Sequence, residues 1–461
     1  MARIAVWLGV LGALVPVQAA AHVSERALVL LLPTGVWIPA GVAAVAASAL
    51  ILFALPGRAV AALFRPLRLG SAPAPPGRLA RGTSVAGCAL LAVLVLAGLT
   101  GPRDPLANPL SLAVWTGFWI LLPLAQAALG DLWGAINPWS GPAALIGVRR
   151  GLWPGALAGA GQLPAVVVWM LFAAFLLADP APDDPARLAR VVGGYWLATM
   201  AAVVLFGPGW LIRGEAFGIW LGHLARLAPL WRDAGGWRLG LPGARLVGAR
   251  GVGRAGAVFL MAVLGAGSFD GLNETFWWLA LIGVNPLEFP GRSAVIGETL
   301  AGLGLFCAGL VAVFAATVMA GLALVGARAR FAEAFGRLAL SLVPIALGYH
   351  LAHYLTVLLV NGQYLLAMLN DPLARGADLL GLGHVHVTTS FFNRLETVRL
   401  IWLAQGGAIV LGHVLAVLVA HAIARDMLGD DRRAALSQLP VAVFMTAYTW
   451  LGLWILAAPT A

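Results

Sequence analysis

Charged residues and cysteines are scarce in this 461-residue sequence. Asp, Glu, Lys and Arg make up 10% of the chain, against about 25% in an average globular protein. The two cysteines, Cys88 and Cys307, each lie in an apolar stretch, which argues against a disulfide framework and a thiolate metal motif. Because 61% of the residues are hydrophobic, a soluble fold could not bury the apolar surface, and the composition predicts a membrane protein.

Lysine is absent, so all 29 basic residues are arginine, and the chain has a formal net charge of +10. The arginines lie mostly in short loops between apolar runs, a distribution that marks membrane topology rather than a nucleic-acid-binding face. Nucleotide-binding signatures are also missing, because the Gly-x-Gly matches fall inside apolar runs, where small residues allow close helix packing. The lipid bilayer is therefore an expected partner, and nucleic acid is not.

The N-terminus has the three parts of a secretory signal. Arg3 precedes an apolar run over residues 4–17, and the alanines at 19–21 form a small-residue cleavage site. The sequence therefore predicts a signal peptide over residues 1–21, whose cleavage leaves residues 22–461 as a single helical transmembrane domain. An uncleaved first helix is the alternative, because short membrane anchors of this kind exist.

Apolar runs of about 20 residues predict an all-α polytopic integral membrane protein, with about ten transmembrane helices after the cleaved signal peptide. With a periplasmic mature N-terminus, the loops that hold most of the arginines become cytoplasmic, as the distribution of positive charge requires. The chain is thus expected to be a multi-pass protein of the bacterial inner (plasma) membrane. The predicted spans are 36–55, 84–100, 111–130, 161–178, 190–212, 255–282, 295–326, 338–360, 398–424 and 438–458.

Two connections, 56–82 and 213–254, are longer than the other loops on the predicted cytoplasmic side. Both are rich in Arg and Gly, and the second also contains several Trp residues. Since Trp and Arg anchor segments at the membrane interface, the two connections are predicted either to lie along the lipid headgroups or to be solvated linkers.

Two pairs of ionisable residues lie inside predicted spans. An ionisable side chain at the centre of a membrane helix costs ~2.5–3.5 kcal/mol on translocon scales, so its presence suggests a function. Asp270 and Glu274 are four residues apart, and His350 and His353 are three apart, so each pair shares one helix face. The predicted topology puts both pairs in the periplasmic half of the membrane, and Asp270 and Glu274 are the predicted catalytic residues.

Imidazoles and carboxylates together form a nitrogen and oxygen ligand set that suits zinc, manganese, iron or copper, and helical bundles build metal sites from such pairs. We therefore predict a divalent transition metal, of open identity, that lowers the pKa of a bound water. The candidate ligands are His350, His353, Asp270, Glu274 and, from a later span, His413. A hydrogen bond to a neighbouring helix is the competing interpretation, above all for His413.

A second nitrogen-rich site is predicted on the exported side. Cleavage after Ala21 would give His22 a free α-amino group beside its imidazole, and copper(II) favours such nitrogen sets. His384 or His386, in the loop before the span 398–424, could add a ligand. A plain solvated loop is the alternative interpretation of these two histidines.

Five segments of the chain are distinctive: residues 22–34, 137–139, 268–272, 275–278 and 342–354. They resemble the bacterial membrane proteins known as fenitrothion hydrolases, and the similarity spans most of residues 22–461. The resemblance implies hydrolysis of an organophosphorus triester, fenitrothion, to a nitrophenol and a dialkyl thiophosphate, alone or with a second, related membrane subunit. It supplies no catalytic residues, so those predictions rest on residue spacing.

The leading functional hypothesis is a membrane-bound hydrolase of organophosphorus triesters. A metal held by Asp270, Glu274, His350 and His353 would supply a hydroxide that attacks phosphorus, and an apolar intramembrane pocket would suit the lipophilic small-molecule substrate. The alternative is a transition-metal (copper-like) or proton-coupled membrane transporter, because a polar cluster at that depth also serves ion pathways. A noncatalytic scaffold for another membrane enzyme is the third interpretation.

Overall fold

Long apolar helices dominate the structure. The computed structural model describes residues 34–71, 77–157 and 159–460, so the predicted signal peptide, residues 1–21, and His22 lie outside the described residues. Helices account for 74% of the structure. Within the described ranges, nine helices are long and apolar enough to cross a membrane, which confirms the prediction of an all-α polytopic membrane protein.

Each predicted span corresponds to a helix or to a run of joined helices. α9 has 16 residues and is shorter than the nine candidate spans. The predicted span 111–130 consists of joined pieces, of which the middle one, η1, is a π-helix. The corresponding elements are α2 (Thr34–Ala54), α4 (Gly77–Thr100), α5 (Pro109–Ser111) with η1 (Leu112–Leu121) and α6 (Leu122–Leu129), α9 (Leu163–Ala178), α10 (Pro185–Phe206), α13 (Gly253–Asn273), α15 (Ile296–Leu324), α17 (Leu342–Asn370), α18 (Leu395–Leu428) and α19 (Asp431–Ala457).

The helix in the predicted span 255–282 is shorter than expected, because α13 ends just before Glu274. The Oγ1 of Thr275 accepts a hydrogen bond from the backbone N–H of Trp278 at 3.2 Å and so caps a new short helix, α14 (Phe276–Leu281). Threonine is a favourable N-cap residue because its oxygen pairs with a backbone N–H that the helix leaves free. The cap places Glu274 in the break between the two helices.

Short elements connect the long helices. α11 has ten residues, too few to cross a membrane, and most of them are buried inside the bundle. The short elements are α3 (Gly57–Leu63), α7 (Trp133–Ile136), α8 (Ser140–Leu145), η2 (Pro208–Ile212), α11 (Ala216–Ala225), α12 (Ala244–Val247), η3 (Pro286–Glu288), η4 (Arg292–Ala294), η5 (Arg328–Arg330), α16 (Phe331–Leu338), η6 (Ala339–Ser341) and η7 (Ser390–Asn393).

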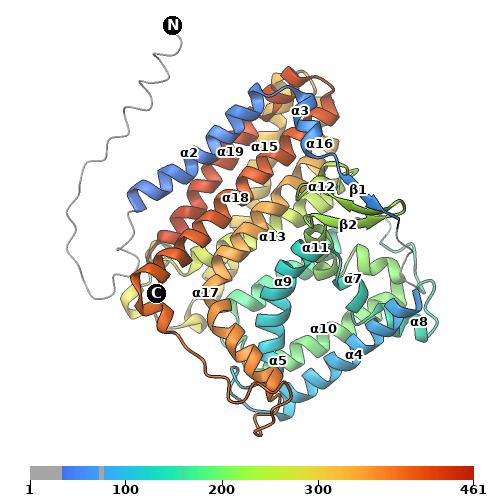
Figure 1. The fold of residues 1–461 in the computed structure, drawn as a ribbon, viewed down its shortest axis with the longest axis vertical. Helices are drawn as coiled ribbons and strands as arrows, with labels where there is room; N and C mark the ends of the chain where they lie inside the picture. Colours follow the sequence, from blue (N-terminus) through green and yellow to red (C-terminus); the bar gives the residue numbers. More distant parts are fainter. Residues whose placement is uncertain (1–33, 72–76, 158, 461) are drawn as a thin grey trace.

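A three-stranded antiparallel sheet joins the two long connections at one end of the bundle (Figure 1). β1 (Leu67–Gly70) comes from the connection 56–82, and β2 (Leu230–Asp233) and β3 (Gly236–Leu239) form a hairpin in the connection 213–254. We call this end of the molecule the sheet end. The sequence did not predict the pairing, because four-residue strands are too short for a clear alternation of apolar and polar residues.

The register of the sheet predicts a specific cross-link. With both native cysteines replaced by serine, Leu67→Cys/Leu239→Cys is expected to form a disulfide on mild oxidation, because these residues are paired on adjacent strands. Arg68→Cys/Leu239→Cys is the control and should stay reduced, since successive side chains of a strand point to opposite faces. Peptide mapping under non-reducing conditions measures both, and equal cross-linking of the two pairs would contradict the register.

α13 is the most buried of the candidate spans within the described residues. Of its apolar window 78% is buried, against 17% for α2 at the edge. α9, α15 and α17 pack around α13, and α18, α19 and α2 continue the bundle on one side (Figure 1). An ionisable residue on α13 therefore meets other helices rather than lipid.

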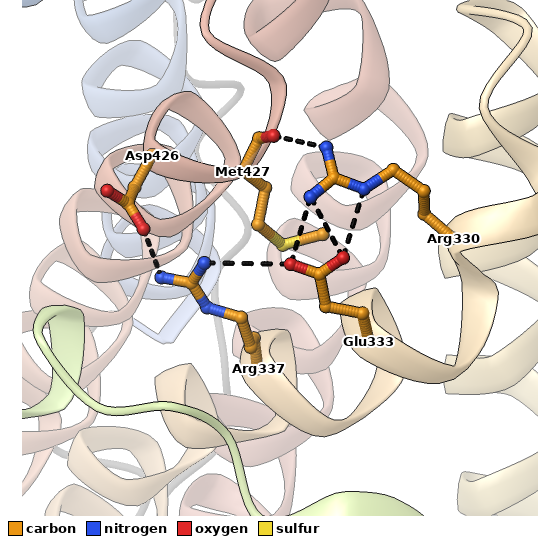
Figure 2. A network of polar contacts seen from close by, with 5 residues as sticks. All are labelled: Arg330, Glu333, Arg337, Asp426 and Met427. Atoms are coloured by element: carbon orange, nitrogen blue, oxygen red, sulfur yellow. Dashed lines mark hydrogen bonds and ion pairs between the residues drawn. The ribbon is translucent and has the colours of Figure 1, made fainter.

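An ion pair and a hydrogen bond link η5 and α16 to the last turn of α18 at the sheet end, as Figure 2 shows. Arg337 pairs with Asp426 at 2.6 Å, and Arg330 pairs with Glu333 at 2.8 Å. Arg330 also donates to the backbone carbonyl oxygen of Met427. Most of these side chains are exposed, so each pair contributes only about 0–1 kcal/mol, but together they fix the position of α16 against α18.

Candidate acid–base site

Asp270, near the end of α13, contacts two side chains of α17. Its Oδ2 accepts a hydrogen bond from the hydroxyl of Tyr354 at 2.6 Å and lies 3.1 Å from Nε2 of His353. Asp270 is buried, with 8% of its surface exposed. One carboxylate oxygen thus joins the two helices, and the structure brings together two of the residues that the sequence singled out.

A carboxylate and an imidazole at this distance can share and exchange a proton. The opposite charge of a partner offsets part of the cost of burying either group. Aspartate and histidine are also common general acids and bases, because neighbouring groups can bring their pKa values into the physiological pH range. An ionisable pair inside a membrane bundle usually marks a functional site.

His350 has a different partner, although it lies one turn before His353 on α17. Its Nε2 is 2.8 Å from the backbone carbonyl oxygen of Trp119, and the two rings meet edge to face with centroids 5.2 Å apart. Trp119 belongs to the π-helix η1. Because π-helical turns are rare and often occur at functional sites, this segment supports the assignment of a site here.

These side chains line a small cavity among η1, α9, α11, α13 and α17. Its volume of about 40 Å³ exceeds the roughly 10–15 Å³ that one water needs but is far below the ~300 Å³ of a small-molecule pocket. The polar groups on its wall include Asp270, His350 and His353. Aromatic rings form much of the remaining wall: Trp119, Trp169, Phe172 and Trp220.

The predicted metal ligands do not converge on one point. Among residues 34–71, 77–157 and 159–460, no three His, Cys, Asp or Glu side chains lie together as a metal ion requires. Nε2 of His353 faces the carboxylate of Asp270, and Nε2 of His350 faces a backbone carbonyl. In this arrangement Asp270 and His353 form an acid–base pair, and the predicted transition metal stays a prediction.

Three other predicted site residues form no hydrogen bond or ion pair with Asp270 or His353 in the described part of the chain. Glu274 is exposed beyond the end of α13, and within the described part of the chain its carboxylate has no hydrogen bond or ion pair. His384 and His386 are exposed in the loop between α17 and α18 and do not line the cavity. His22 lies outside the described residues, so the second nitrogen site stays a prediction.

His413 is fully buried on α18, in a neighbouring group of polar side chains. Its Nδ1 is 2.9 Å from the carbonyl oxygen of Ile409, one turn earlier, and its Nε2 has no partner among the described residues. The ring centroids of Tyr349 and Tyr448 lie 6.1 Å and 6.3 Å from that of His413. This contact lies within α18 itself, so the hydrogen bond to a neighbouring helix that the alternative interpretation expected is not found among the described residues.

Two residues of the site were missed as candidates. Tyr354 follows His350 by four residues, and helical periodicity places it beside the two histidines, but no role was predicted for it. Trp119 could not have been found, because its contact with His350 uses a backbone carbonyl whose direction depends on the π-helix.

Comparisons with known proteins give no match. The sequence matches no protein-family model, and neither a curated protein nor a solved structure is significantly similar to it. The resemblance to fenitrothion hydrolases therefore stays a prediction, and the function has to be argued from the site.

Proposed function

We propose that this chain is a proton-coupled transporter of the bacterial inner membrane, in which Asp270 and His353 bind and release the coupling proton. The observation that carries the proposal is the buried contact of 3.1 Å between their side chains, with the Tyr354 hydroxyl on the same carboxylate oxygen. Carboxylates and imidazoles inside membrane helices form proton relays. The proposal puts the sheet end in the cytoplasm and the mature N-terminus in the periplasm, because the arginine-rich connections meet at the sheet end.

The size of the cavity favours a proton over an organic substrate. A volume of about 40 Å³ has room for a few water molecules, through which protons move, but not for a triester. Both members of the pair line this cavity. Water in it would therefore reach the carboxylate of Asp270 and the imidazole of His353 alike.

Protonation of the pair can be converted into a change in helix packing. While His353 is an imidazolium and Asp270 a carboxylate, their opposite charges hold α17 against α13. Transfer of the proton from Nε2 to the carboxylate leaves two neutral groups and removes this attraction. Release of the proton to water leaves a neutral imidazole beside the carboxylate and removes it as well, so the helices can separate. A transporter needs such a link between proton binding and conformation, because a ligand shifts an equilibrium only through its different affinity for two states.

Hydrolysis of an organophosphorus triester is the second candidate function, favoured by the aromatic wall of the cavity. Trp169, Phe172 and Trp220 offer an apolar surface to an aryl group, and the indole Nε1 of Trp169 has no partner among the described residues and could donate to a phosphoryl oxygen. The Asp270 and His353 pair would then act as the general base for a water. This candidate requires the cavity to widen. A metal ion and a second membrane subunit are further proposals that belong to it.

Reconstitution separates the two candidates. The purified full-length chain is placed in liposomes that contain a pH-sensitive dye, with potassium and valinomycin to clamp the membrane potential, and the outside is acidified. The lumen of liposomes with the wild-type protein is expected to acidify faster than that of protein-free liposomes. If a metal ion is the coupled solute, external Mn²⁺, Zn²⁺ or Cu²⁺ should change the rate of acidification. The same preparation is incubated with fenitrothion, and nitrophenol is measured by absorbance. Nitrophenol release without proton flux would overturn the transporter proposal.

A further inference from the structure

A second, much larger cavity lies at the sheet end. Its volume of about 800 Å³ is within the range of small-molecule sites, roughly 300–1,000 Å³. The loop before α9, the helix η2, the helix α11 and the first turn of α13 surround it. Because α9 and α13 begin here and α10 ends just before η2, the cavity lies at the boundary of the membrane, on the side opposite to the end of α13 that carries Asp270.

Three arginines line this cavity: Arg213, Arg226 and Arg254. Among the described residues no carboxylate lines it, and none of the three arginines forms an ion pair. Glu215 lies nearby in the sequence, but its carboxylate accepts a hydrogen bond from the hydroxyl of Tyr195 at 2.6 Å and bonds to backbone N–H groups at the start of α11. The positive charge of the cavity is therefore not neutralised by the surrounding side chains.

Two residues that line the cavity, His223 and Gln162, also have buried side-chain atoms without hydrogen-bond partners among the described residues. His223, on α11, is 5% exposed and lines the cavity, and its Nδ1 has no hydrogen-bond partner among the described residues. The Oε1 of Gln162 is likewise buried without a partner within the described ranges. Burial and the neighbouring Arg245 lower the pKa of Arg226, as expected where positive charges gather without an anion. Polar groups that are buried without partners cost stability.

The backbone can also approach a ligand closely here. Glycines line the cavity from three segments, and two of them, Gly251 just before α13 and Gly253 at its first position, have φ values of 96° and 67°. Only glycine adopts this region readily, because it has no Cβ. At Gly253 an added Cβ would meet no atom within 4 Å, so the backbone there is open to a ligand.

We infer that this cavity binds an anionic phosphate group, either the headgroup of a lipid or a soluble phosphate compound. The planar guanidinium group donates two parallel hydrogen bonds to phosphate oxygens, and three such groups line this cavity. The position at the membrane boundary suits an anionic headgroup, and the volume suits a soluble compound. The site is independent of Asp270, so it extends beyond the proposed transport function.

Native mass spectrometry of the purified full-length chain tests this site. Detergent micelles contain equal amounts of phosphatidylglycerol and phosphatidylcholine, and retained lipid is counted with and without inorganic phosphate. Arg226→Gln/Arg254→Gln is compared with Arg150→Gln, which removes an exposed arginine outside the cavity lining. The wild type and the control are expected to retain phosphatidylglycerol in preference to phosphatidylcholine, and the double variant to lose at least about tenfold in that preference, since two charge-assisted contacts are removed.

Inorganic phosphate identifies the source of the anion. A soluble phosphate compound is the ligand if phosphate displaces the lipid and raises the thermal midpoint of the wild type more than chloride does. The ligand is a lipid headgroup if phosphate has neither effect and phosphatidylglycerol is retained. Size-exclusion chromatography checks that the double variant is folded. The inference is overturned if the folded wild type retains both lipids equally and phosphate has no more effect than chloride, a result that does not depend on any variant.

Discussion

Asp270→Asn is expected to lower proton flux into proteoliposomes by about 100-fold or more, the effect of removing a group that transfers the proton. Asparagine has nearly the size of aspartate and can still accept the hydrogen bond from Tyr354, which is 2.6 Å long in the wild type. It cannot carry a negative charge or take up a proton. His353 therefore loses the partner that lies 3.1 Å from its Nε2, and the helix contact no longer depends on protonation.

Two comparisons show whether this loss belongs to the pair. Glu298→Gln removes an acidic charge from the exposed first turn of α15 and should change the flux by less than about twofold, as a surface substitution does. His353→Gln should lower the proton flux as far as Asp270→Asn does. The flux of the double variant should be no lower than that of either single variant, because the effects of substitutions in residues that act as a unit are not additive. Wild-type flux in folded Asp270→Asn protein would show that the contact is only structural.

Gly412→Val should strongly reduce the yield of folded protein. A Cβ at Gly412 on α18 would lie 2.6 Å from the backbone carbonyl oxygen of Pro344 on α17, and a Cβ at Gly348 would lie 2.5 Å from that of Ala408. The two backbones approach this closely only because both positions lack a side chain. Overpacking of this kind costs about 1–3 kcal/mol or more. Since α17 carries His353, the forced separation also disturbs the acid–base site.

The matched control is Gly407→Ala, on the same helix α18, where an added Cβ meets no atom within 4 Å. This substitution should leave the protein as stable as the wild type or slightly more stable, because alanine is a better helix former than glycine. Size-exclusion chromatography after heating in detergent measures both variants. Equal thermal midpoints for Gly412→Val and Gly407→Ala would contradict the close crossing of α17 and α18.

Hydropathy predicted where the long helices lie but not where they end. The predicted span 338–360 stops where Asn361 and Gln363 lower the hydropathy, yet α17 continues to Asn370. A polar residue does not interrupt backbone hydrogen bonds, so the helix extends past the apolar run. At its other end the same predicted span included residues 338–341, which belong to the end of α16 and to η6.

Residue spacing predicted the part of the site that lies on continuous helices. Asp270 and His353 meet because each lies on a continuous helix, where spacing fixes the face. Glu274 is the C-cap residue of α13 and lies near Asp270 and His353. Because Thr275 caps a new helix directly after it, Glu274 lies at the exposed break between the helices and forms no hydrogen bond or ion pair among the described residues. His350 does lie beside His353, but its Nε2 contacts a carbonyl oxygen of a π-helix. Which helices pack together, and how they turn, depends on contacts between distant segments that a single sequence does not reveal.

The position of α2 has a consequence for how the protein is made. α2 packs against α18 and α19, and beyond its end the backbone N–H of Gly57 donates to Asp431 at 2.9 Å, across 374 residues of chain. At a synthesis rate of about 5–20 residues per second, its partners emerge roughly 20–70 s after it. During that interval α2 must wait in the lipid, which its apolar surface allows. Assembly can therefore be completed only when translation is nearly over, and a chain that stops before α18 leaves its first helix without partners.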